Sequence, residues 1–179
     1  LHHPLAPERA AQLLPPDAVF VAVLRDPTER AYSHYRERRA NDTEPLSFDE
    51  AIEAEAWRLR GEEDRIVNNP GYRSFAHRHQ GYLAQSRYAS ALRRWFDSVG
   101  QDRVLVLISE ELYADPQAAV DEVTDRLGLP RRPLRNPTAH NSEPSREISE
   151  DTRARLTAAL GPDVDATERL LGRNLPWQR

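Results

Sequence analysis

Two short apolar blocks stand out from a chain that is otherwise rich in polar residues. Residues 19–24 (VFVAVL) and 104–108 (VLVLI) are continuous runs of mainly aliphatic side chains. Runs of this length, without the alternation of a half-exposed strand, are typical of strands buried on both faces in parallel sheets. Each block is followed by polar residues that suit the start of a helix. We therefore predict two parallel strands in one sheet.

Most of the remaining chain carries helical patterns. Asp26 and Pro27 combine an N-cap with a favoured first helical residue, and Ser47 with Glu50 has the spacing of a capping box. The predicted helices cover residues 5–14, 27–40, 48–59, 82–99 and 115–128, followed by a closing helical pair over 149–160 and 163–171. The polar residues 60–71 are predicted to form a loop.

Strands separated by helical crossovers predict an α/β fold, a parallel sheet flanked by helices, in a single domain over residues 1–179. Two strands are too few for a sheet that supports so many helices. The chain also begins at Leu1 and contains no Met. We therefore expect it to be the C-terminal portion of a domain whose remaining strands lie outside this sequence.

Composition argues against several classes of function. There are 25 Lys and Arg residues against 29 Asp and Glu, and the resulting net charge of -4 argues against nucleic-acid binding. The absence of Cys rules out disulfides and thiolate metal sites, and we expect no metal site. No apolar run approaches the ~20 residues of a membrane span, and no basic leader precedes an apolar stretch. We therefore expect no membrane span and a cytoplasmic location.

The candidate chemistry lies directly after the first predicted strand. Ligands of open parallel sheets bind beyond the carboxyl ends of the strands, which is where Arg25 stands. The following helix is expected to offer free backbone N–H groups, and Ser33 follows one or two turns into it. Arg25, Ser33 and the helix start therefore predict a phosphate cradle. The alternative is that Arg25 pairs with Asp26 or Glu29 while Ser33 faces solvent.

The run over residues 23–35 resembles the 3′-phosphate-binding signature of sulfotransferases that use 3′-phosphoadenosine 5′-phosphosulfate (PAPS). That signature is a strand, then Arg-[Asp/Asn]-Pro, a second Arg, and a Ser eight residues after the first Arg, as in Arg25 to Ser33. Further similar segments follow the family order at 3–5, 14–18, 46–51, 81–82, 95–96, 104–107, 110–112, 115–116, 127–129 and 170–173, with Trp177 at the end. The resemblance covers nearly the whole chain and is strongest to bacterial members and the heparan-sulfate-type branch.

The sequence also departs from the family. Sulfotransferases begin with a strand, a Gly-rich loop containing Lys-x-Gly-Thr-Thr, and a helix, which together hold the 5′-phosphosulfate. No such loop is present, and the 7 Gly residues are scattered. The catalytic Glu or His of the family also precedes the segment seen here. The resemblance therefore implies a P-loop NTPase-like sulfotransferase fold without its N-terminal part, and leaves the catalytic base unknown.

By this resemblance, the chain is expected to act in PAPS-dependent sulfonate transfer to a hydroxyl or amine, with release of adenosine 3′,5′-bisphosphate. The acceptor is expected to be a small molecule, a lipid or a carbohydrate. In the family, the residues that match Arg25 and Ser33 hold the 3′-phosphate. A non-catalytic nucleotide-binding or interaction module derived from this fold is the alternative function.

Two further cofactor-binding residues are expected from the resemblance. Tyr82 is expected to line the nucleotide or acceptor cleft, with core packing as an equally good interpretation. Arg146, in the sequence Pro144-Ser145-Arg146, is a weak counterpart of the Lys-Gly-Arg loop that closes over the nucleotide in heparan-type members.

Overall fold

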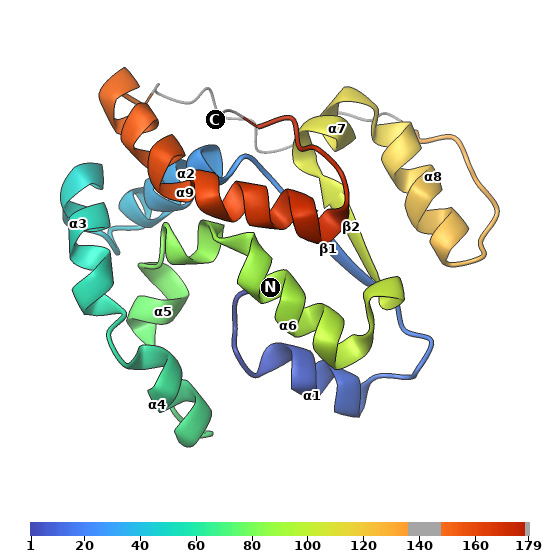
Figure 1. The fold of residues 1–179 in the computed structure, drawn as a ribbon, viewed down its shortest axis with the longest axis horizontal. Coiled ribbons are helices and arrows are strands. Elements are labelled where there is room, and N and C mark those ends of the chain that lie inside the picture. The colour runs from blue at the N-terminus through green and yellow to red at the C-terminus, as the bar shows by residue number, and fades with distance from the viewer. Residues whose placement is uncertain (136–147, 178–179) are drawn as a thin grey trace.

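The structure is a computed structural model, which describes residues 1–135 and 148–177 (Figure 1). In chain order its elements are α1 (Ala6–Leu13), β1 (Phe20–Leu24), α2 (Pro27–Ala40), α3 (Phe48–Arg58), α4 (Glu62–Asn68), α5 (Phe75–His79), η1 (Ala84–Ser86), α6 (Tyr88–Val99), η2 (Gln101–Arg103), β2 (Val104–Ile108), α7 (Ser109–Ala114), α8 (Pro116–Arg126) and α9 (Glu150–Leu171). The two η elements are 3₁₀ turns. The expected α/β class is confirmed.

The sheet of the described residues has two strands, β1 and β2, which pair in parallel. The register runs from Phe20 opposite Val104 to Leu24 opposite Ile108, so the carboxyl ends of both strands meet at one edge. The prediction of parallel strands is therefore confirmed. The prediction that β1 is buried on both faces is wrong, because Val21 and Val23 are 47% and 55% exposed. Most of β2, by contrast, is buried. The described residues leave that face of β1 open.

Two hydrophobic clusters hold the helices together. The larger joins the strands to α6, α9 and the C-terminal segment through Leu24, Tyr88, Leu92, Phe96, Val99, Val104, Ile108, Val164, Leu175 and Trp177. The smaller joins α2, α3 and the start of α9 around Ala31, Phe48, Ala51, Tyr82, Ile148 and Leu156. Figure 1 shows α3, α4 and α5 at one side of the molecule and α7 and α8 at the other. The helix α2 therefore connects the sheet edge to the smaller cluster.

Residues 60–71 do not form the predicted loop, because α4 occupies most of them. Gly61 adopts a left-handed conformation with φ of 72°, which separates α4 from α3. The first turn of α4 is acidic, which the helix dipole favours, and Ile66 is buried. One buried apolar residue in a charged segment gives no helical periodicity to read, so the sequence pattern missed this helix.

The predicted boundaries of the later helices need two corrections. The helix expected from Tyr82 begins at Tyr88, and a 3₁₀ turn precedes it. The predicted closing pair is one helix, α9, which continues through Gly161 and Pro162. Its buried positions recur every three or four residues across the proline, at Thr152, Leu156, Leu160, Val164 and Thr167. The continuous buried face offsets the backbone hydrogen bond that Pro162 cannot make.

Candidate functional site

The junction between β1 and α2 is fixed by contacts from two other elements. The Tyr88 hydroxyl donates to the backbone carbonyl of Arg25 at 2.9 Å. The backbone N–H of Asp26 donates to Glu110 Oε1 at 2.9 Å, and Trp177 Nε1 donates to Glu110 Oε2 at 3.2 Å. Glu110 follows β2, so it joins the carboxyl ends of the two strands. The backbone from which Arg25 projects is therefore held in place.

The N-terminus of α2 is capped by its own sequence. Asp26 Oδ1 accepts from the backbone N–H groups of Thr28 at 2.9 Å and Glu29 at 3.0 Å. The N–H of Arg30 donates to the Asp26 carbonyl at 2.8 Å, and Pro27 has no N–H. The expectation that this helix start offers free N–H groups to a phosphate was therefore wrong. The carboxylate that makes Asp26 a good N-cap occupies the donors of the first turn.

Arg25, just before α2, and Ser33, on α2, both have accessible side chains. The Arg25 side chain is 44% exposed, and its Nη2 lies 3.6 Å from Glu29 Oε2. Ser33 is exposed and follows Glu29 by four residues, so the two lie on the same face of the helix. The arrangement given as the alternative to a phosphate cradle, with Arg25 paired to Glu29 and Ser33 exposed, is thus present. The pair is long and partly exposed, a geometry that contributes little to stability and leaves the guanidinium available.

Arg30, the second arginine of the signature, is bound to the protein at several points. Its Nη1 donates to the Tyr82 carbonyl at 3.1 Å and to Ser86 Oγ at 3.2 Å, and its Nη2 donates to Gln85 Oε1 at 2.6 Å. Burial lowers the pKa of Arg30 from its usual value. This guanidinium joins α2 to the segment 82–86 and has a structural role.

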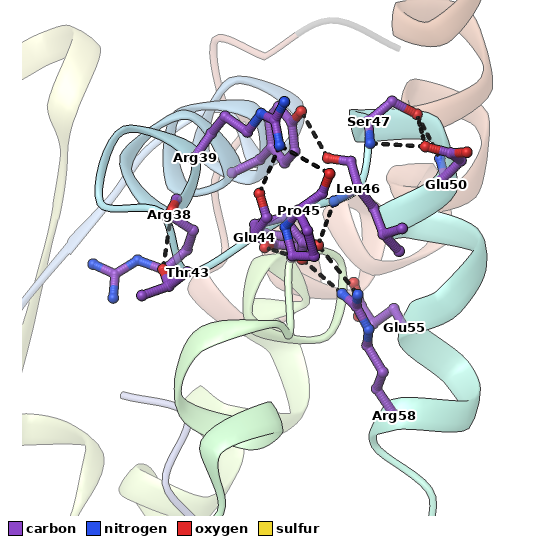
Figure 2. Close-up of polar contacts among 12 residues, drawn as sticks. Arg38, Arg39, Thr43, Glu44, Pro45, Leu46, Ser47, Glu50, Glu55 and Arg58 are labelled. Atoms are coloured by element: carbon purple, nitrogen blue, oxygen red, sulfur yellow. Dashed lines mark hydrogen bonds and ion pairs between the residues drawn. The ribbon is translucent and has the colours of Figure 1, made fainter.

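Tyr82 lies in the core instead of lining a cleft. It is 0% exposed, and its hydroxyl donates to Glu44 Oε2 at 2.8 Å. Burial, together with the hydrogen bond to Glu44, raises the pKa of Tyr82. Arg58 also donates to both oxygens of Glu44, at 2.6 and 3.1 Å, and Figure 2 shows this side chain reaching Glu44 from α3. Of the two interpretations of Tyr82, the contacts describe core packing.

A second buried carboxylate fixes the same segment. Glu55 of α3 is 6% exposed and accepts from the backbone N–H groups of Leu83 at 2.8 Å and Ala84 at 2.7 Å. Burial raises the pKa of Glu55 above its usual value. The segment 82–86 is therefore held by α3 on one side and by Arg30 of α2 on the other.

A further arginine, which the sequence pattern does not predict as part of this region, pairs with Glu29 near the end of β1. Arg153, in the first turn of α9, places Nη1 2.5 Å from Glu29 Oε1, so Glu29 lies between Arg153 and Arg25. No pattern in the sequence links these positions, because only the packing of α9 on α2 brings them together. Arg146 lies outside the described residues.

The N-terminal histidines meet a third one from α5. The ring of His77 lies 5.0 Å from that of His2 and 6.0 Å from that of His3, measured between centroids. Burial lowers the pKa of His2 from 6.5 to about 3, with His77 as a further cause. Within residues 1–135 and 148–177, no group of three or more His, Asp or Glu side chains could hold a metal ion. In the same ranges, no helix is long and apolar enough to span a membrane.

The geometry at the strand end, a short Arg-Asp-Pro turn into a capped helix, can be compared with known proteins. A model of the sulfotransferase domain matches residues 2–153 of this chain. The chain belongs to the sulfotransferase family. Membership implies PAPS as the sulfonate donor, as the resemblance of residues 23–35 predicted. The small parallel sheet flanked by helices agrees with the fold expected of this family.

Relatives come from both branches that the sequence resembles. The chain is 29% identical over 131 residues to bifunctional heparan sulfate N-deacetylase/N-sulfotransferase 4 of Mus musculus and 31% identical over 134 residues to enzyme 3 of Homo sapiens. Each alignment covers 72% of this chain and 13% of the relative. A crystal structure of a sulfotransferase from Alicyclobacillus acidocaldarius matches with a TM-score of 0.71 and 30% identity, covering 97% of this chain and 62% of that one.

Proposed function

We propose that this sulfotransferase binds PAPS by its 3′-phosphate, through Arg25 and Ser33, and acts in sulfonate transfer to a hydroxyl or amine. The observation that supports the proposal is the placement of Arg25 directly after β1, with Ser33 on the exposed face of α2 that also carries Glu29. A guanidinium fork suits phosphate oxygens, and a hydroxyl adds a compact neutral donor.

The rest of the strand end supports this role by holding the backbone. Tyr88 and Glu110 fix the residues on either side of the Arg25–Asp26 peptide, and Arg30 ties the first turns of α2 to the segment 82–86. A binding group is effective when its backbone is already ordered before the ligand arrives. The side chains offered to the phosphate are accessible, while those that position them are engaged.

PAPS would supply the sulfonate: the acceptor oxygen or nitrogen forms a bond to sulfur, the sulfur–oxygen bond to the 5′-phosphate breaks, the acceptor proton is lost, and adenosine 3′,5′-bisphosphate leaves. Arg25 and Ser33 contact the end of the nucleotide remote from sulfur. Their contribution is therefore to orient the nucleotide, which lowers the entropic part of the barrier. We assign no residue to the transfer of the acceptor proton.

We propose a carbohydrate amine or hydroxyl as the acceptor. The two curated relatives are named for N-sulfation of heparan sulfate, a carbohydrate. The comparisons favour a transferase over a non-catalytic module, because the family match covers residues 2–153 and includes the whole of α2.

Calorimetry with adenosine 3′,5′-bisphosphate tests the proposed phosphate site. A charge-assisted Arg–phosphate bond exceeds a neutral hydroxyl bond, so Arg25→Ala should weaken binding by about ten- to a hundredfold and Ser33→Ala by about two- to tenfold. Adenosine 5′-phosphate, which lacks the 3′ group, should bind both variants as it binds the parent. Arg93→Ala, an exposed arginine on α6, serves as a charge-matched control and should change neither affinity.

Two results would contradict the proposed site. One is equal binding of the two nucleotides by the parent, which would show that the 3′-phosphate has no site. The other is an equal loss of both nucleotides in Arg25→Ala, which would show that the substitution disturbs the fold instead of a phosphate contact.

A further inference from the structure

A 3′-phosphate carries nearly two negative charges and three acceptor oxygens, more than one arginine and one serine can satisfy. The backbone donors of the first turn of α2 are not available, because Asp26 already accepts from Thr28, Glu29 and Arg30. The fork of Arg30 is likewise engaged by the segment 82–86. The remaining donors for the phosphate must come from another element.

The helix α9 supplies such a donor. Arg153 Nη1 lies 2.5 Å from Glu29 Oε1, and Arg25 Nη2 lies 3.6 Å from Glu29 Oε2, so one carboxylate bridges two guanidinium groups. The side chains of Arg25, Glu29 and Arg153 are 44%, 27% and 32% exposed. A carboxylate held between two accessible guanidinium groups occupies the kind of position that suits another anion.

We propose that Arg153 is a second guanidinium of the 3′-phosphate site and that Glu29 occupies both arginines until the phosphate replaces it. The proposal rests on the phosphate site proposed above for Arg25 and Ser33. Binding would exchange one anion for another: the carboxylate gives up Arg25 and Arg153 to the phosphate oxygens and turns to solvent. The partial exposure of Glu29 permits this movement, because its carboxylate regains water when it leaves.

The same helix carries a matched control. Arg155 lies two residues from Arg153, is 54% exposed, and pairs with Asp49 of α3 instead of Glu29. Calorimetry on the full polypeptide should show Arg153→Gln weakening adenosine 3′,5′-bisphosphate binding by about five- to thirtyfold, while Arg155→Gln stays within about twofold of the parent. Adenosine 5′-phosphate should bind all three proteins alike.

Glu29→Gln tests the exchange of anions. If Glu29 competes with the phosphate, removing its charge should tighten adenosine 3′,5′-bisphosphate binding by about two- to fivefold, since a partly exposed ion pair is lost and a like charge disappears. If Glu29 instead holds the arginines in place for the ligand, the same variant binds more weakly. Weaker binding would overturn this part of the proposal.

The outcomes separate this proposal from the one on which it rests. A parent protein that binds the two nucleotides equally contradicts the phosphate site as a whole. Loss of the 3′-phosphate preference in Arg25→Ala, together with full affinity in Arg153→Gln, leaves the phosphate site standing and overturns the role of Arg153. Equal melting temperatures of Arg153→Gln and Arg155→Gln would exclude a folding defect as the cause of weaker binding.

Discussion

The two sides of α2 use their arginines in opposite ways. On the inner side, Arg30 donates to three acceptors of the segment 82–86, which Glu55 fixes in turn from α3. On the outer side, Arg25 is 44% exposed, and among the described residues its ion pair is the one with Glu29, at 3.6 Å. Arg25 and Arg30 nevertheless stand only five positions apart in one signature. The inner side is saturated with protein contacts, and the outer side is not.

We infer from this difference which arginine of the motif is available to a ligand and which one holds the motif in shape. A guanidinium whose fork is already engaged loses protein contacts if it turns to a ligand, whereas one with a weak partner exchanges it at little cost. By this criterion Arg30 is a framework residue, and Arg25, whose pair with Glu29 is long and partly exposed, is the one that we propose to bind the phosphate. The two sides should therefore respond differently to substitution, in stability on the inner side and in affinity on the outer side.

The largest effect is expected at Glu44, a buried carboxylate between α2 and α3 that contacts Tyr82, next to the segment held by Arg30. The Glu44 side chain is 0% exposed and accepts from Arg58, from Tyr82, and from the backbone of Leu46. Glu44→Ala leaves the Arg58 charge and the Tyr82 hydroxyl without a partner, so we expect a loss of about 3–5 kcal/mol in the free energy of unfolding, measured with urea. Glu53→Ala, an exposed acid on α3, should stay within about 0.5 kcal/mol.

Arg30 should show the next largest effect on stability. Arg30→Ala removes the donor for the Tyr82 carbonyl, Ser86 and Gln85, and we expect the free energy of unfolding to fall by about 2–3 kcal/mol. Arg30→Lys restores the charge but not the fork, so it should recover only part of this loss. Full recovery by lysine would show that the charge alone matters and that the three contacts do not.

The sequence predicted the elements whose signals are local. The apolar runs defined both strands, and the N-cap residues Asp26 and Ser47 defined the starts of α2 and α3. The sequence pattern did not predict α4 or the continuation of α9 through Pro162, because tertiary contacts decide the structure at both places. The residue after Pro162, Asp163, accepts from the N–H of Tyr88 at 2.6 Å, which anchors α9 to α6. No local sequence pattern near Pro162 predicts that contact.

The candidate site shows the same division. Arg25 and Ser33 can be proposed from the sequence because they belong to one short motif, whose spacing is visible there. Arg153, which we propose as a further member of the site, cannot be inferred from the sequence, because its pair with Glu29 depends on the packing of two helices that are distant in the chain. The sequence predicts the N-cap at Asp26 correctly, and the structure shows that the capping carboxylate also withholds the N–H groups of the first turn from a ligand.

A smaller, pH-dependent effect is expected at His34, next to Ser33 on α2. Burial lowers the pKa of His34 from 6.5 to about 4, with the positive charges of Arg30 and Arg38 as further causes, while Glu37 opposes and His79 adds to the shift. In the unfolded chain, His34 therefore binds a proton below about pH 6.5, whereas in the folded chain it does so only below about pH 4. Unfolding therefore takes up a proton at His34 in this window, so the contribution of His34 to the free energy of unfolding falls as the pH drops from 7 to 4.

Replacing the imidazole of His34 isolates its contribution to the pH dependence of stability. His34→Gln binds no proton, so its free energy of unfolding should fall less between pH 7 and pH 5 than that of the parent, by about 1–2 kcal/mol after allowance for partial exposure. The free energy of unfolding of the variant will still decrease with falling pH, because the pKa of His2 is also lowered, to about 3. Parallel pH profiles of urea unfolding for the two proteins would show that His34 is readily protonated in the folded state.

The smallest effect on stability is expected on the outer side, at Arg25. Its pair with Glu29 is 3.6 Å long and partly exposed, so Arg25→Ala should change the free energy of unfolding by no more than about 0.5 kcal/mol. The same variant is expected to lose about ten- to a hundredfold in adenosine 3′,5′-bisphosphate affinity. Urea unfolding and calorimetry on one preparation compare the two quantities directly. A loss of stability as large as that of Arg30→Ala would remove the contrast between the two sides of α2, because Arg25 would then be a framework residue as well.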